Sequence, residues 1–192
     1  IKRVKQVTNK PTGIKFVLGC SEDLDDLLNS FIKNDVYPSF ITLDSADGGT
    51  GAAPAALMDH VGLTINKSLP LLMAHLSASS LREKIPVCVS GKLIMPADIA
   101  WALAQGAVAV NTARGAMFAL GCIQALQCHA NTCPTGITTH NKRLKKGLDP
   151  ISKSQRVSNF IINTKKQVGY IAHSTGAACA RSIDPSRVMR ND

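Results

Sequence analysis

The sequence lacks the features that would place it in a membrane, in a secretory pathway or on a nucleic acid. No apolar run approaches the roughly 18–20 residues that a membrane-spanning helix needs. The basic opening stretch 1–13 lacks the apolar segment of a secretory signal. Aromatic residues make up only 4% of the 192, so the alternation of basic and aromatic side chains typical of nucleic-acid binding is missing. We therefore expect a globular, cytoplasmic protein without a membrane span and without a nucleic-acid partner.

Acidic residues are few relative to basic ones. The chain has 22 Lys and Arg against 13 Asp and Glu, which gives a net charge of +9 at pH 7. The basic excess lies mostly in residues 1–10, 141–146 and 164–167. Without interleaved aromatic residues, such segments are typical of solvated basic faces or of contacts to an acidic partner domain.

Two nucleotide-binding motifs are missing as well. No GxGxxG follows the first predicted strand, and GxxxxGK[ST] occurs nowhere in the chain. The first absence argues against a dinucleotide-binding Rossmann unit, and the second argues against a P-loop.

What the sequence does contain is an alternation of short apolar strands and amphipathic helices. The strands are predicted at 13–19, 39–45, 86–91 and 107–114. The helices are predicted at 21–34, 54–62, 69–84, 95–106 and 115–130. Four consecutive βα units indicate an α/β protein with a parallel sheet. Either a doubly wound open sheet or a stretch of a (β/α)8 barrel fits this order.

Glycine and polar residues follow three of the four predicted strands. They lie in the stretches "DSADGGTGAAP" (44–54), "SGKLIMP" (90–96) and "TARGAM" (112–117). In both candidate architectures the carboxyl ends of the strands meet at the edge where ligands bind. Glycine there lets backbone N–H groups approach a phosphate or a flat ring, so we expect the functional site at this edge.

Three of the six cysteines, Cys122, Cys128 and Cys133, lie within twelve residues. Cys122 and Cys128 are about 120° apart on a helix, so we expect the helix to break near Cys128 and the chain to loop back with Cys133. Three converging thiolates suit a three-iron cluster. A zinc site that adds His129 or His140, a pair of disulfides and three unconnected core cysteines are the alternatives.

Several of these stretches together resemble a known family. "GIKFVLG" (13–19), "ADGGTGAAP" (46–54) and the stretch 90–137 resemble the FMN-binding synthase domain of the glutamate synthase family, in the FMN-binding glutamate-synthase-like branch. The resemblance covers about residues 11 to 140. It implies the second half, strands five to eight, of a (β/α)8 TIM barrel with a cysteine-rich loop. We predict this half-barrel for residues 1–140 and a helical appendage for residues 141–192.

The resemblance also implies roles for individual residues. Lys15 corresponds to a catalytic lysine near the flavin's pyrimidine edge, where a cation stabilises the reduced ring, and Asp47 is the second catalytic residue. The cofactor contacts it implies are Lys15, Gly48, Gly49, Thr50, Ser90, Gly91, Lys92, Ala113, Arg114 and Gly115. The cluster ligands it implies are Cys122, Cys128 and Cys133. Lys92 stands where the family usually has a second glycine.

The resemblance implies an oxidoreductase that acts on CH–NH2 groups. FMN and a 3Fe–4S cluster would be its cofactors, with electrons passing between the cluster and the flavin. The enzyme would reduce a 2-imino acid similar to 2-iminoglutarate to an amino acid, as in glutamate biosynthesis. Asp59 and His60 stand where relatives that bind 2-oxoglutarate carry basic residues. The expected partners are an electron-donor protein or an NAD(P)H-oxidising subunit. A non-catalytic binding module that carries a cluster or zinc on the same fold is the alternative.

The first half of the barrel is expected outside these residues. About four more βα units would lie upstream in the parent polypeptide or in a partner chain. Without them, the outermost strands at 13–19 and 107–114 would present unpaired backbone groups to water. We therefore expect these 192 residues, when expressed alone, to aggregate or dimerise and to bind little FMN.

Overall fold

A four-stranded parallel sheet organises the protein. The computed structural model describes residues 1–47, 56–57 and 59–190. The strands are β1 (Ile14–Val17), β2 (Ile41–Asp44), β3 (Val87–Ser90) and β4 (Ala109–Asn111), and they lie side by side in chain order. All three pairings are parallel. Within the described residues the sheet thus lacks the order reversal of a doubly wound sheet, and it is consistent with part of a (β/α)8 barrel.

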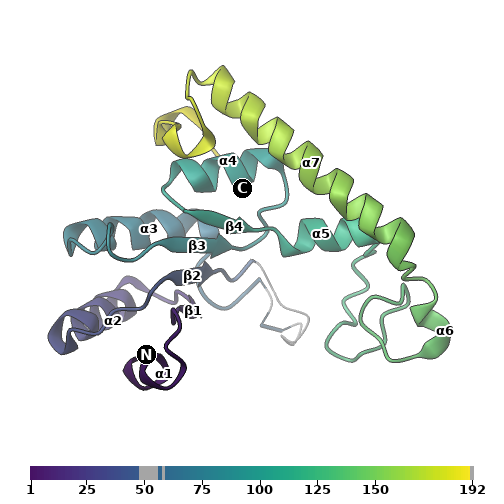
Figure 1. Cartoon of the computed structure of the whole chain (residues 1–192), viewed down its shortest axis with the longest axis horizontal. Helices are drawn as coiled ribbons and strands as arrows, with labels where there is room; N and C mark the ends of the chain where they lie inside the picture. The colour runs from purple at the N-terminus through teal and green to yellow at the C-terminus, as the bar shows by residue number, and fades with distance from the viewer. Residues whose placement is uncertain (48–55, 58, 191–192) are drawn as a thin grey trace.

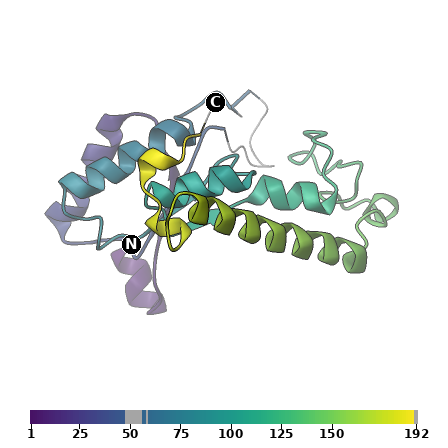
Figure 2. The ribbon, with the colours of Figure 1, turned by 90° about the horizontal axis from the view of Figure 1, so that it is seen from above.

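Helices connect and cover the strands (Figure 1). The first half of the chain has α1 (Lys2–Thr8), α2 (Ser21–Asn34), α3 (Ile65–Ala78) and α4 (Pro96–Ala104). The second half has α5 (Ala113–Leu120), α6 (Lys142–Lys145), α7 (Pro150–Ser174) and the short 3-10 helices η1 (Ala180–Ser182) and η2 (Pro185–Arg187). The long α7 packs along α4 and α5, and Figure 2 shows it extending toward the loops that precede α6. None of the helices within the described residues is long and apolar enough to cross a membrane.

Alternation along the strands separates the core from the site. In β2, Ile41 and Leu43 are fully buried, whereas Thr42 and Asp44 are only partly buried. The strand β3 repeats this pattern, with Val87 and Val89 in the core. Because successive side chains point to opposite faces of a sheet, the apolar set packs in one core with leucines of α2 and α3. The polar set is left on the opposite face.

The residues of α2 account for its buried face and for where it begins and ends. Its buried residues Leu24, Leu28 and Phe31 are spaced as one face of a helix requires. Glu22 and Asp23 lie in the first turn, where negative charge is favourable. Asp35 ends the helix in a left-handed conformation with φ of 48°. The predicted helix at 21–34 is therefore confirmed.

Three predicted helices differ from those observed. The helix predicted over 69–84 is α3, which begins at Ile65 and ends at Ala78. Residues 56, 57, 59 and 60 lie in turns, so the prediction of a helix over 54–62 is wrong for the part that the structure describes. Asp59 has φ of 66° and Gly62 has φ of 98°, and neither value is compatible with a right-handed helix. The helix predicted over 115–130 is α5, which ends at Leu120 because Gly121 adopts a left-handed conformation with φ of 103°. The break expected near Cys128 is therefore wrong by about two turns.

The part of the chain that was predicted as an appendage is helical. Asp149 caps the start of α7 by accepting a hydrogen bond from the backbone N–H of Ser152, and Pro150 is the first helical residue. Val168 and Ala172 of α7 are buried, and this helix packs against α4. The boundary at residue 140 itself stays a prediction.

Candidate functional site

A pocket of about 590 Å³ opens at the carboxyl edge of the sheet. Its wall includes residues from β1 to β4, the turn after β3, the start of α5 and the segment 122–129. The predicted site residues that line it are Lys15, Ser90, Gly91, Lys92, Ala113, Arg114, Cys122 and Cys128. The fold therefore gathers at one place side chains that are more than one hundred positions apart in the sequence.

An ion pair lies on the strand face of the pocket. Lys15 Nζ lies 2.8 Å from Asp44 Oδ2, and the hydroxyl of Ser90 donates to Asp44 Oδ1 at 2.6 Å. Burial would raise the pKa of Asp44, but hydrogen bonds from Lys15, Ser90 and the Ser45 backbone N–H hold it below its ordinary value. Asp44 is thus ionised at neutral pH and fixes both the ammonium group of Lys15 and the hydroxyl of Ser90.

The turn after β3 depends on its two central residues. Gly91 has φ of 132°, a conformation that essentially only glycine adopts. A Cβ atom placed on Gly91 would overlap the hydroxyl oxygen of Ser45. Lys92 has φ of 44°, in the left-handed region that favours glycine. Its Nζ lies 2.7 Å from Asp59 Oδ1. The cation at this turn is therefore held by the carboxylate of Asp59, which also lines the pocket.

The start of α5 contributes to the pocket in part. Ala113 and Arg114 line it, together with Thr112 just before the helix. Gly115 is buried and does not line this pocket; it lies against α7, where an added Cβ atom would overlap the ring of Phe160. The structure thus gives Gly115 a role in helix packing.

Asp47 lies outside the lining of the pocket and beneath the turn after β3. Its Oδ1 accepts a hydrogen bond from Ser45 Oγ, and its Oδ2 lies 3.9 Å from Arg190. Among the described residues Asp47 thus contacts Ser45 and Arg190, and its catalytic role stays a prediction. The predicted cofactor contacts Gly48, Gly49 and Thr50 lie outside the described residues.

The three clustered cysteines are divided between two environments. Cys122 and Cys128 line the pocket, beside His129. Cys133 is only 7% exposed, and its thiol lies 3.2 Å from the Thr135 hydroxyl. Burial raises the pKa of Cys133, but hydrogen bonds from the Thr135 hydroxyl and nearby backbone N–H groups lower it to about 6. No three His, Cys, Asp or Glu side chains of the described residues lie close enough together to hold a metal ion, so the convergence expected for a ligand set is not present.

Sequence reasoning missed two charged residues of this region. Asp44 is the last residue of β2, and a carboxylate at the end of an apolar strand is the signal that could have identified it. Arg190 carries no local signal, because its partners lie far away in the sequence. His60 is exposed in a turn and is absent from the pocket lining, so only Asp59 of that predicted pair reaches the pocket.

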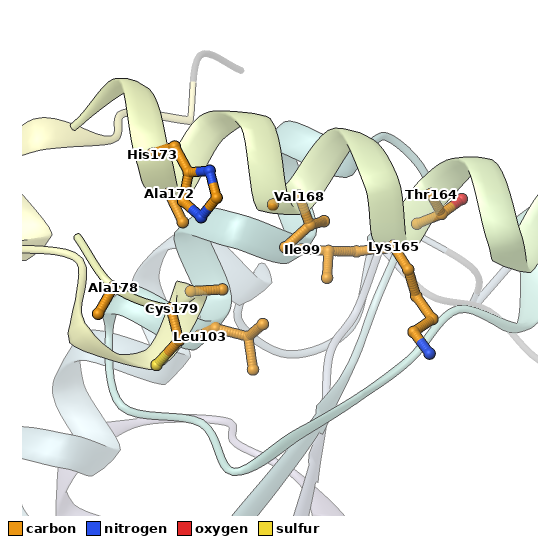
Figure 3. Close-up of a pocket in the computed structure, with 11 residues that line it drawn as sticks. Ile99, Leu103, Thr164, Lys165, Val168, Ala172, His173, Ala178 and Cys179 are labelled. Atoms are coloured by element: carbon orange, nitrogen blue, oxygen red, sulfur yellow. The ribbon is translucent and has the colours of Figure 1, made fainter. Parts of the chain in front are cut away.

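A second cavity, of about 420 Å³, lies between α4, α7 and η1. Figure 3 shows Ile99 and Leu103 of α4 facing Val168 and Ala172 of α7, with Cys179 at the edge of the cavity. Its lining is mainly apolar and includes none of the predicted site residues.

The fold is that of an α/β protein, and a pocket with charged side chains lies at the carboxyl edge of its parallel sheet. Residues 1–178 match the family model described as the conserved region in glutamate synthase. The chain therefore belongs to the glutamate synthase family.

Individual relatives agree with this family. The chain is 43% identical to the glutamate synthase large subunit-like protein YerD of Bacillus subtilis over 176 aligned residues. The aligned region covers 92% of this chain and 34% of that protein. It is 37% identical over 151 residues to the archaeal glutamate synthase (NADPH) of Methanocaldococcus jannaschii, and the aligned region covers 79% of this chain and 29% of that protein. It is 35% identical over 136 residues to the ferredoxin-dependent glutamate synthase of Antithamnion sp., and the aligned region covers 71% of this chain and 9% of that protein. The chain thus spans about a third or less of the length of these relatives.

Proposed function

We propose that this chain is part of an FMN- and iron–sulfur-dependent oxidoreductase that reduces a 2-imino acid to an amino acid. The observation that carries this proposal is the gathering of Lys15, Gly91, Arg114 and Cys128 around one pocket in a member of the glutamate synthase family. The natural substrate would be a small 2-oxo acid or its imine. The electrons would come from a donor protein or an NAD(P)H-oxidising subunit, and the enzyme would work in the cytoplasm.

The residues of the pocket fit FMN. Gly91 leaves room for backbone N–H groups to approach a phosphate, and Arg114 supplies a cation at the start of α5. FMN, when bound, would supply the hydride for the reduction. Lys15, held by Asp44, would stabilise negative charge on the pyrimidine side of the ring.

The cluster rests on the chemistry of the donors. Thiolates are the ligands of iron–sulfur clusters, and Cys122, Cys128 and Cys133 are the thiols that the family resemblance assigns to this role. Binding at all three would require the segment 122–133 to rearrange from the described arrangement. Zinc is the alternative on donor chemistry, since Cys122, Cys128 and His129 line one pocket, but these side chains too would have to move together to bind it. With zinc, the module would bind a partner or ligand without redox chemistry.

Cofactor analysis of the full-length protein tests the proposal. We expect FMN to be released by heat and identified by chromatography, and about three iron atoms per chain in metal analysis. FAD or NAD in place of FMN would contradict the flavin assignment. One zinc atom without iron and without a flavin absorption band would favour the binding module.

Replacing Lys15 by methionine is expected to make the flavin harder to reduce while leaving the fold intact. The side chain of Lys15 is 56% exposed, so little packing is lost, although Asp44 loses the cation that pairs with it. In the proposed site the change also removes a cation beside the reduced ring. A loss of about 1.4 kcal/mol of stabilisation corresponds to a fall of about 30 mV in a two-electron potential. Spectroelectrochemical titration measures it, with the exposed Lys10→Met as the matched control. An unchanged potential would remove Lys15 from the flavin site.

A further inference from the structure

We propose that Arg190, in the C-terminal segment, is a positioning residue that holds the turn 90–95 in its ligand-binding shape. The ligand of that turn is taken to be the FMN phosphate, so this part of the inference rests on the proposed function. The effect on the turn itself does not depend on which ligand binds.

Arg190 reaches three separate parts of the chain. Its Nε lies 3.2 Å from Asp98 Oδ1 in α4, and its NH1 donates to the side-chain oxygen of Asn66 in α3 at 2.7 Å. Its NH2 lies 3.9 Å from Asp47 Oδ2, and its guanidinium carbon lies 6.0 Å from the centre of the Trp101 ring. A guanidinium has donors in a fixed planar fork, so one side chain can join these groups at once.

The two carboxylates that Arg190 contacts lie at opposite ends of the turn: Asp98 binds one end directly, and Asp47 fixes the side chain that lies against the other. Asp98 Oδ2 accepts hydrogen bonds from the backbone N–H groups of Ile94 and Met95 at 3.2 and 3.0 Å. At the other end, Asp47 accepts from the hydroxyl of Ser45, and that hydroxyl lies directly beneath Gly91. Arg190 therefore reaches the end of the turn through one residue, Asp98, and its start through two, Asp47 and Ser45.

Burial makes this arrangement depend on the charge of Arg190. The side chains of Arg190, Asp47 and Asp98 are only 12%, 13% and 19% exposed. Buried carboxylates without a cation are costly and repel each other. Loss of Arg190 would therefore disturb Asp47 and Asp98 together, and the turn between them would loosen.

The C-terminal segment has its own anchors, so this effect can be separated from loss of the segment. Ile183 and Val188 are 2% and 8% exposed and belong to the hydrophobic core. Replacing Arg190 would leave these two contacts in place.

Hydrogen exchange of the full-length protein without cofactor tests the effect on the turn. In Arg190→Ala we expect the amides of Ile94 and Met95 to exchange about tenfold faster than in the wild type. Arg190→Lys, which keeps the charge but not the fork, should recover part of the protection. Arg187→Ala, at the exposed neighbouring turn η2, is the matched control and should change nothing. Unchanged exchange at 94 and 95 in Arg190→Ala would overturn the inference.

A titration of the same variants with FMN tests the link to the ligand. We expect the dissociation constant of FMN to rise about tenfold in Arg190→Ala and to be unchanged in Arg187→Ala. If exchange at the turn changes while the wild-type protein binds no FMN, the proposed function fails and the positioning role stands. If the wild type binds FMN and Arg190→Ala binds it equally well, the role of Arg190 in ligand binding is refuted.

Discussion

Replacement of Gly91 by alanine is expected to lower the stability of the protein by about 3 kcal/mol and to weaken FMN binding about a hundredfold. Alanine at φ of 132° carries a backbone strain of about 1–3 kcal/mol. The added methyl group would also overlap the buried hydroxyl of Ser45, which costs about 1–3 kcal/mol more unless the turn moves. Movement of the turn would displace the donors for the phosphate, and about 2.8 kcal/mol corresponds to a hundredfold change in affinity.

Denaturant unfolding and FMN titration of the full-length protein measure the two effects of Gly91→Ala. The matched control is Gly169→Ala in α7, where an added Cβ atom would meet nothing within 4 Å. Since alanine favours a helix over glycine by about 1 kcal/mol, that variant should be slightly more stable than the wild type. Gly91→Ala with wild-type stability and affinity would show that the turn neither needs glycine nor holds the cofactor.

Replacement of Cys128 by serine is expected to reduce the iron content from about three atoms per chain to nearly none. A hydroxyl is a poor substitute for a thiolate on iron, and each of three irons would need its own cysteine. Cys128 is only partly buried, so its replacement should leave the melting temperature of the cofactor-free protein nearly unchanged. Metal analysis together with the visible absorption of the cluster measures the loss.

The matched control for the cluster is Cys20→Ser. Cys20 is exposed at the start of α2 and lies outside the clustered cysteines, so iron should be retained at the wild-type level. Retention of all the iron in Cys128→Ser as well would exclude this thiol as a ligand, and the cluster assignment would then have to be abandoned.

The sheet could be predicted from the sequence because its signals are local. Each strand is a short apolar run with β-branched residues, such as Ile41 and Val89, and its alternation fixes which face is buried. The placement of Ser90 and Arg114 at one edge then follows from parallel order, whereas Lys15 is assigned to the site by the family resemblance alone. All three line one pocket, and their role in binding a cofactor stays a prediction.

The parts that could not be predicted depend on backbone conformation or on distant contacts. Asp59 adopts a positive φ that the sequence pattern does not reveal, so the periodic pattern over 54–62 predicted a helix that the described residues do not form. Gly121 lies inside an apolar repeat where glycine is often tolerated, yet there it ends α5. The separation of Cys133 from Cys122 and Cys128 depends on the turn at Thr135, which spacing alone does not reveal.

The contacts of Arg190 also have a consequence for the order in which the protein is completed during synthesis. Arg190 is 92 residues beyond Asp98 and 124 beyond Asn66. At about 5–20 residues per second, the ribosome would add Arg190 roughly 5 to 20 seconds after Asp98. Through that interval the strands β1 to β4 can pair, because each neighbours the next along the chain. Asp47 and Asp98 would meanwhile have no cation from Arg190, so a growing chain acquires its sheet before it acquires a finished binding turn.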